Sequence, residues 1–345
     1  MVAVKEEDGS RRHQVTRRQF LAQAGIGAAG LMALGGCRHF PALFAGPPAP
    51  PDLLTRRRRV WVWADTHIGL GKDGKDGGEW AELSIREMQK NLAAPDYTLV
   101  LGDITHRYRP EEFREYARLR EFSGWPRWYE LVGNHDFNGT TSGEYWRHVR
   151  REERYVLLDG NVAWILVSAE RGKSDGILRP PTRAWLKKVV AKHQDKNVIV
   201  CTHQLVENTL RDSDHDGAVI YPDDWIKQLL KDHRIDVWLC GHEHAGRRDR
   251  RQIRKIGRTL FVNVASLSHA YHTRACNSFL FEMNAGERAF DARCRHHDLE
   301  KYVPTLSTRV ELAYAMRFDT RPRIVDVLPP SAYDPRAARR PDKNY

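Results

Sequence analysis

Short runs of β-branched and aromatic residues alternate along this chain with longer stretches of helical periodicity. Buried strands are predicted for the apolar runs at 60–64, 97–101, 128–132, 198–201 and 237–240. Between these runs, apolar residues recur at helical spacing, which predicts helices over 79–94, 111–122, 182–194 and 223–233. Strands that alternate with helices predict an α/β fold.

Each predicted strand is followed at once by polar residues. In chain order these are Asp65-Thr66-His67, Gly102-Asp103, Gly133-Asn134-His135-Asp136, Thr202-His203 and Gly241-His242-Glu243-His244. Ligands of α/β sheets bind beyond the carboxyl ends of the strands. We therefore expect all five polar ends to converge on one site.

The side chains at these strand ends are typical metal ligands. They comprise carboxylates, an amide and imidazoles, namely Asp65, His67, Asp103, Asn134, His203, His242 and His244. Mixed oxygen and nitrogen ligands suit Mn, Fe or Zn. The set is too large for one tetrahedral ion, so two ions about 3.5–4 Å apart, sharing one carboxylate, are the economical arrangement. Such a pair makes hydroxide available at neutral pH and neutralises the oxygens of a phosphate.

The order DxH, GD, GNHD, TH and GHEH resembles the calcineurin-like metallophosphoesterase family over about residues 58–270. The resemblance implies a four-layer α/β/β/α sandwich of two mixed sheets flanked by helices. It also implies a dinuclear phosphoesterase that cleaves mono- or diesters by attack of metal-activated hydroxide. The implied first ion is held by Asp65, His67 and His244, the second by Asn134, His203 and His242, with Asp103 as the bridge.

The resemblance gives His135 a catalytic role instead of a ligand's role. It would face the phosphate and either stabilise the developing charge or protonate the leaving oxygen, with Asp136 orienting its ring. The stretch Gly102 to His106 lacks the tyrosine of purple acid phosphatases three residues after the bridging aspartate, and His106-Arg107-Tyr108 does not match the Asp-Arg-Gly of protein phosphatases. A small phosphate ester, including a cyclic nucleotide, is thus the expected substrate.

Further residues could line the substrate side of this site, or could equally be surface polar residues. They are His106, Arg109, His269, Tyr271 and His272.

Charge leaves two other functions open. The net charge of +11 suits nucleic acid, an anionic surface or an anionic small substrate, and does not choose among them. A nuclease is suggested by the basic residues Arg247, Arg248, Arg250, Arg251, Arg254 and Lys255. An inactive, metal-bound scaffold at the cell envelope is the other alternative, although neither His135 nor any expected ligand is lost.

Residues 1–37 are typical of an export signal. A twin-arginine pattern is formed by Arg17-Arg18-Gln19-Phe20-Leu21, followed by a tract rich in Ala, Gly and Leu. The ending Leu34-Gly35-Gly36-Cys37 resembles a lipoprotein cleavage box, which leaves a lipid anchor at Cys37 open. We expect a periplasmic or otherwise extracytoplasmic protein, and the signal argues against a nuclease.

The remaining boundaries follow from composition. A Pro- and Arg-rich linker is expected over 38–57, the metallophosphoesterase domain over 58–300, and a C-terminal extension over 301–345.

An acidic loop between two predicted elements matches the start of a calcium-binding loop. Carboxylates at Asp212, Asp214 and Asp216 alternate, and Gly217 provides the sharp turn. The flanking Pro222 and an Asp at the twelfth position argue against a true EF-hand. An acidic loop without calcium is the alternative.

The cysteines lack CxxC spacing, so a zinc ribbon is not expected. Strands over 277–283 and 287–293, joined by a three-residue loop at 284–286, would place Cys276 opposite Cys294. An oxidising compartment would allow a disulfide between them, while folding in the reducing cytosol before export favours free thiols.

Overall fold

The computed structural model describes residues 56–71, 75–137, 143–170, 176–214, 217–244, 252–269 and 276–332. Residues 1–37, expected as an export signal, lie outside the described residues, as does nearly all of the linker expected over 38–57. None of the described helices is both long and apolar enough to cross a membrane.

The first of two mixed sheets is built around three parallel strands. They are β1 (Arg57–Trp63), β2 (Tyr97–Leu101) and β3 (Trp128–Leu131). Within the described part of the chain the sheet has seven strands in the order β12-β11-β10-β1-β2-β3, and β13 also pairs with β11. The other strands are β10 (Asn277–Asn284), β11 (Ala289–His296), β12 (Lys301–Tyr302) and β13 (Thr308–Glu311).

The second sheet follows the order β14-β4-β5-β6-β7-β9-β8. Its parallel centre consists of β5 (Val162–Val167), β6 (Asn197–Thr202), β7 (Val237–Cys240) and β9 (Thr259–Asn263). Antiparallel strands complete it at β4 (Arg154–Asp159), β8 (Ile253–Ile256) and β14 (Arg323–Val325). Strands from residues 301–325, a stretch expected as an extension, therefore pair in both sheets.

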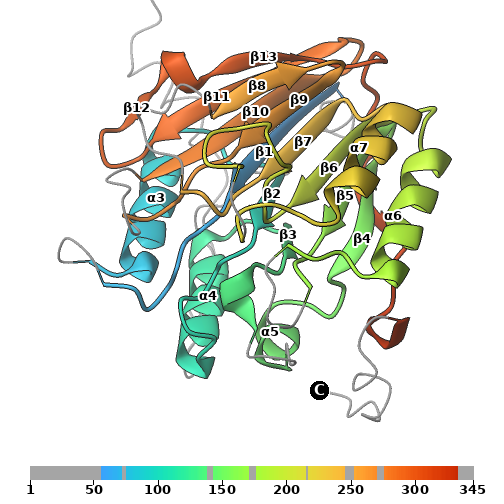
Figure 1. Ribbon diagram of the computed structural model, residues 1–345. Helices are drawn as coiled ribbons and strands as arrows, with labels where there is room; N and C mark the ends of the chain where they lie inside the picture. Colours follow the sequence, from blue (N-terminus) through green and yellow to red (C-terminus); the bar gives the residue numbers. More distant parts are fainter. Residues whose placement is uncertain are drawn as a thin grey trace, which may run out of the picture. The chain divides into compact units, whose positions relative to one another are not determined.

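Four helices cover the outer faces of the two sheets. In Figure 1, α3 (Gly77–Asn91) and α4 (Pro110–Ser123) lie on one side, and α6 (Pro180–Lys192) and α7 (Asp223–Asp232) lie on the other. The helix ends follow from local chemistry, since Asp76 caps α3 and Pro110 begins α4. A short helix, α5 (Gly143–His148), follows β3 and was not expected.

Alternation along the strands creates the layers. Val60 and Val62 of β1 pack with Ala64, the residue after β1, in the core between the sheets, whereas Trp61 and Trp63 pack against α3 and α4. The second sheet alternates in the same way against α6 and α7. This is the expected four-layer α/β/β/α sandwich, and it places the carboxyl ends of β1, β2, β3, β6 and β7 at one edge.

The expected disulfide is wrong. Phe279 pairs with Cys294, a register shifted by three residues from the expected one, because the first strand ends one residue later and the second begins two residues later than expected, at Asn284 and Ala289. An odd shift moves a side chain to the other face of a sheet. Cys294 consequently packs between the sheets, Cys276 packs against the helices, and both are free thiols.

Candidate metal centre

Loops at the carboxyl ends of strands from both sheets bring the polar motifs together. The Asp65 amide donates to the Gly102 carbonyl at 3.0 Å, which joins the ends of β1 and β2. The Gly241 amide donates to the His203 carbonyl at 2.9 Å, which joins β6 and β7. The two sheets meet where the His242 amide donates to the Asp65 carboxylate at 2.9 Å.

A first group of ligand atoms consists of Asp65, His67 and His244, all within 4.8 Å of one another. Nε2 of His67 lies 3.0 Å from Nε2 of His244, and the latter lies 3.3 Å from Oδ1 of Asp65. Asp65 and His67 are fully buried. Two of these ligands come from the first sheet and one from the second.

A second group consists of Asp103, His203 and His242, again within 4.8 Å. Nδ1 of His242 lies 3.2 Å from Nε2 of His203, which lies 3.1 Å from Oδ2 of Asp103. The same carboxylate oxygen lies 3.6 Å from Nε2 of His67, so Asp103 stands between the two groups. Asn134 is tied to this side by Gln204, whose amide donates to Asn134 Oδ1 at 3.5 Å.

The pKa values of the two facing imidazoles of the second group are shifted in opposite directions. Burial opposes the charge on His203, but the Asp103 carboxylate raises its pKa to about 10. Burial and the neighbouring His203 lower the pKa of His242 to about 4. Burial would raise the pKa of Asp103, yet the nearby His203 lowers it well below its ordinary value.

The first group repeats this pattern. Burial lowers the pKa of His67 well below its ordinary value, whereas Asp65 outweighs burial and raises the pKa of His244. In both groups, two nitrogens face each other across a position that demands a positive charge beside a carboxylate. This donor set fits a transition-metal cation at each position, because imidazole nitrogens and carboxylate oxygens are the ligands that Mn, Fe and Zn accept.

The backbone at these residues is strained. Left-handed φ angles occur at non-glycine residues, namely Asp65 (+54°), His67 (+49°), Asp103 (+49°), His242 (+70°) and His244 (+36°). Each such residue costs about 1–3 kcal/mol and persists only where the surroundings enforce it. The fold therefore accepts strain at the residues whose side chains converge.

Two glycines let the strand ends approach one another. A Cβ on Gly133 would overlap the Asp103 carboxylate, and one on Gly241 would overlap Ala64 and lie 2.7 Å from Oδ2 of Asp65. The glycines of GNHD and GHEH thus serve close approach to the two carboxylates.

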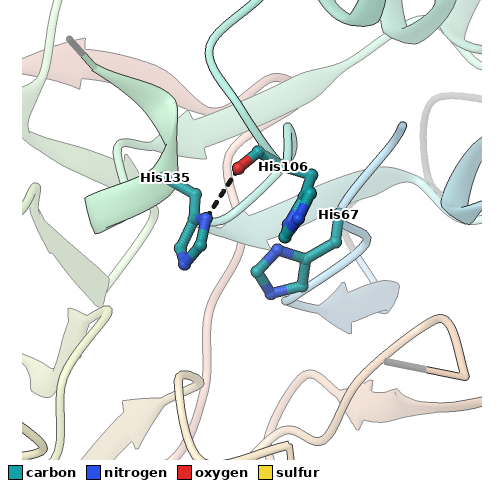
Figure 2. Close-up of side chains that lie close together, drawn as sticks. All are labelled: His67, His106 and His135. Carbon is teal, nitrogen blue, oxygen red and sulfur yellow. Dashed lines mark hydrogen bonds between the residues drawn. The ribbon is translucent and has the colours of Figure 1, made fainter. Parts of the chain in front are cut away.

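His135 lies beside these groups, and its ring is held differently from the expectation. Figure 2 shows Nδ1 of His135 against the backbone carbonyl of His106, at 2.8 Å. The Asp136 carboxylate instead accepts hydrogen bonds from the Gly133 amide and from the amide and hydroxyl of Thr105. Burial and the Asp103 charge raise the pKa of Asp136 to about 6. The expected orienting role of Asp136 is thus taken by a carbonyl of the neighbouring loop.

Of the other residues expected on the substrate side, one lies in the histidine cluster and the rest lie elsewhere or outside the described residues. His106 joins His67 and His135 in a three-histidine group, with its ring stacked on His135 at 5.4 Å between centroids. His269 stacks on Trp80 of α3 and lies 3.4 Å from the Asp298 carboxylate. Arg109 is the exposed residue that caps α4. Tyr271 and His272 lie outside the described residues.

The acidic loop expected to bind calcium is only partly described. Asp212 lies 3.0 Å from the Arg211 guanidinium, while Asp216 lies outside the described residues. The calcium site stays a prediction.

Several supporting contacts were not foreseen. Nδ1 of His203 donates to the Leu101 carbonyl at 2.7 Å, which leaves Nε2 as its ligand atom. The hydroxyls of Ser266 and Ser268 both donate to the Asp65 carbonyl. Most of these partners are backbone carbonyls, which any residue type carries, so residue identities give no signal for them.

A two-sheet sandwich with nitrogen and oxygen ligands at the strand ends of both sheets defines the class of metallophosphoesterases. Residues 58–246, more than half of the chain, match the family model described as calcineurin-like phosphoesterase. The chain belongs to this family, whose members use divalent metals.

The chain is also similar to one named relative and to one solved structure. It is 28% identical over 156 residues to the probable glycerophosphodiester phosphodiesterase GpdQ of Arcobacter nitrofigilis, a match over 44% of this chain and 57% of the relative. The structure of purple acid phosphatase PPD1 from yellow lupin (Lupinus luteus) seeds has a TM-score of 0.50 and is 11% identical, over 74% of this chain and 54% of the plant protein. The chain thus spans little more than half the length of either protein, and the second likeness supports the fold alone.

Proposed function

We propose that this protein is a phosphodiesterase that acts on small phosphate esters with two bound metal ions. The observation that carries the proposal is the position of the Asp103 carboxylate, which lies between two histidine-containing groups and contacts both. One carboxylate shared by two ligand groups is the arrangement that a dinuclear centre requires.

The ligand roles follow from the two groups. Asp65, His67 and His244 would hold one ion, while His203, His242 and Asn134 would hold the other, with Asp103 shared. When bound, such ions neutralise phosphate oxygens and make hydroxide available at neutral pH.

His135 is the side chain that would act directly on the substrate. A carbonyl can only accept a hydrogen bond, so the His106 carbonyl fixes a proton on Nδ1 of His135 and leaves Nε2 as the atom that can act on substrate. In its imidazolium form the ring also carries a proton on Nε2, which it donates to the leaving oxygen or in a hydrogen bond to the phosphoryl group. The His135 amide also donates to Oδ1 of Asp103 at 2.8 Å, which fixes the catalytic residue relative to the shared ligand.

A diester is favoured over a monoester because the relative from Arcobacter nitrofigilis is named as a probable diesterase. The positively charged residues of the mature chain suit an anionic substrate of either kind. We also propose that the chain is exported by the twin-arginine route, which fractionation of cells carrying wild-type protein or a variant with Arg17 and Arg18 changed to Lys would test.

The function is tested by stripping the full-length protein with chelator and restoring Mn²⁺, Zn²⁺ or Fe²⁺ separately. We expect bis(p-nitrophenyl) phosphate and glycerophosphodiesters to be hydrolysed only after metal is restored, and faster than p-nitrophenyl phosphate. Asp236→Asn serves as a control, because this buried carboxylate lies at the opposite end of β7 from His242. Metal binding without hydrolysis would favour the scaffold, and cleavage of DNA or RNA alone would favour the nuclease.

A further inference from the structure

The peptide group between His106 and Arg107 is held at both of its ends. Its carbonyl accepts the hydrogen bond from Nδ1 of His135 at 2.8 Å (Figure 2). Its N–H, which belongs to Arg107, donates to Oε2 of Glu112 at 2.9 Å. In a trans peptide these two groups point in opposite directions. Glu112 and His135 are therefore joined through a single peptide group.

Glu112 is built firmly into this position. It belongs to the first turn of α4, is only 4% exposed, and accepts a second hydrogen bond from the Arg109 amide at 3.1 Å. A side chain on Gly69, in the loop after β1, would overlap the Glu112 carboxylate. The same loop pins His106, whose amide donates to the Ile68 carbonyl at 3.0 Å.

We propose that Glu112 is a positioning residue for His135 and acts through the peptide that joins His106 to Arg107. This inference rests on the proposed function of His135. The carboxylate fixes the plane of the peptide, so its carbonyl holds the His135 ring in one orientation and one tautomer. Its negative charge at the N–H end also polarises the peptide and strengthens the carbonyl as an acceptor, since linked hydrogen bonds reinforce one another.

Asp136 does not supply this support, because its carboxylate holds Gly133 and Thr105. The carboxylate that supports His135 is thus Glu112 of α4, which acts through the peptide group between His106 and Arg107.

The alternative is that Glu112 only caps α4. It occupies the third position of that helix and bonds the capping residue's amide, the arrangement of a capping box. The chain offers a control in Glu79, an exposed residue that occupies the same position in α3 and accepts from the Asp76 amide at 2.8 Å. Loss of either carboxylate weakens one helix cap, but only Glu112 is linked to His135.

The experiment compares Glu112→Gln and Glu112→Ala with Glu79→Gln and Glu79→Ala in the full-length protein. Histidines labelled with ¹⁵N report the tautomer of His135 in chelator-treated protein, and His135→Ala identifies its signals. Steady-state kinetics of the Mn²⁺-loaded protein with bis(p-nitrophenyl) phosphate give kcat and KM separately. Thermal midpoints show how far each variant weakens the fold.

We expect wild-type His135 to carry its proton on Nδ1, and the Glu112 variants to populate the Nε2–H tautomer. We expect kcat to fall about tenfold, the low end of what outer partners of site residues contribute, with KM unchanged. The Glu79 variants should leave both readouts as in wild type. An unchanged tautomer and kcat in both Glu112 variants, or equal effects of the Glu79 variants, would overturn the proposal. If wild-type protein hydrolyses nothing, the proposed function fails, and the tautomer alone still decides the role of Glu112.

Discussion

Two buried clusters of histidine and carboxylate in this molecule have opposite characters. At the strand ends, imidazole nitrogens face one another at 3.0 and 3.2 Å beside carboxylates. Around Glu87 of α3, each polar group has a partner of the complementary kind. The Glu87 carboxylate bonds the Arg295 guanidinium, the Asn91 amide and Nδ1 of His297, which lies 2.8 Å away.

From Glu87 the hydrogen-bond network continues toward the core through His297, and each contact joins a donor to an acceptor. Nε2 of His297 lies 2.7 Å from the Ser278 hydroxyl, which accepts from the indole N–H of Trp61 at 2.6 Å. Hydrogen bonds saturate this network, and Arg295 provides its positive charge. We therefore infer that the Glu87 network stabilises the fold and does not bind a metal ion.

The difference between the clusters is the source of positive charge. An arginine lies within bonding distance of Glu87, whereas imidazoles lie within 3.3 Å of Asp65 and Asp103 in the strand-end cluster. The backbone differs too, since left-handed φ angles occur at five of the seven strand-end residues, all but Asn134 and His203, and not at Glu87, Arg295 or His297. Burial of histidine beside a carboxylate is thus a weak sign of a metal site, and facing nitrogens on a strained backbone are a stronger one.

The largest effect is expected for Asp103→Asn. Loss of the Asp103 carboxylate should remove bound metal. It should also raise the activation free energy by several kcal/mol, which lowers kcat on the order of 10³-fold or more. Metal content by mass spectrometry and hydrolysis of bis(p-nitrophenyl) phosphate measure both. Full metal content in Asp103→Asn would show that this carboxylate is not shared.

His135→Ala should separate chemistry from metal binding. We expect this variant to keep its metal and to lose about 10²–10⁴-fold in kcat, because the ring acts on the transition state. Metal content and hydrolysis of bis(p-nitrophenyl) phosphate are measured as for Asp103→Asn. Loss of a metal ion would show that His135 is a ligand.

Glu87→Gln should lower the stability of the fold and leave catalysis unchanged, unlike His135→Ala. Breaking a buried ion pair costs about 3–5 kcal/mol of unfolding free energy, because Arg295 loses its charged partner. Chemical denaturation measures this loss. The folded variant should retain wild-type metal content and kcat, and a lower metal content would mean that the two clusters are coupled.

The smallest effect expected is a pH dependence of the Glu87 contribution. Burial opposes ionisation of Glu87, but hydrogen bonds from His297, Arg295 and Asn91 lower its pKa from 4.5 to about 2. A carboxyl with a depressed pKa stabilises the fold above its unfolded pKa, and this contribution fades as pH falls toward the folded pKa. The stability difference between wild type and Glu87→Gln should therefore be constant above about pH 5 and shrink toward pH 2. A difference that does not change over this range would contradict the assignment.

The sequence predicts the strand-end cluster well because its chemistry is carried by side chains directly after apolar runs. Strands β4 and β5 were not expected, although Val162 to Val167 is continuously apolar, because no polar motif follows them. The register of β10 and β11 was missed because a loop of four residues and one of three both accommodate the glycine at 286.

The contacts that hold the strand-end side chains in place were harder to predict than the convergence of those side chains. The carbonyls of Leu101 and His106 orient His203 and His135, and only the folded backbone determines which carbonyl lies there. The Glu87 network joins α3 to β10 and to residues after β11, far apart in sequence, through side chains that carry no recognisable motif.

The two proposed metal positions can be located by anomalous diffraction from crystals of the full-length protein soaked in Mn²⁺. We expect two manganese peaks, one beside Asp65, His67 and His244 and one beside Asp103, His203 and His242, with none beside Glu87 and His297. A structure without manganese at the strand ends, or with manganese bound by the Glu87 network, would contradict this expectation.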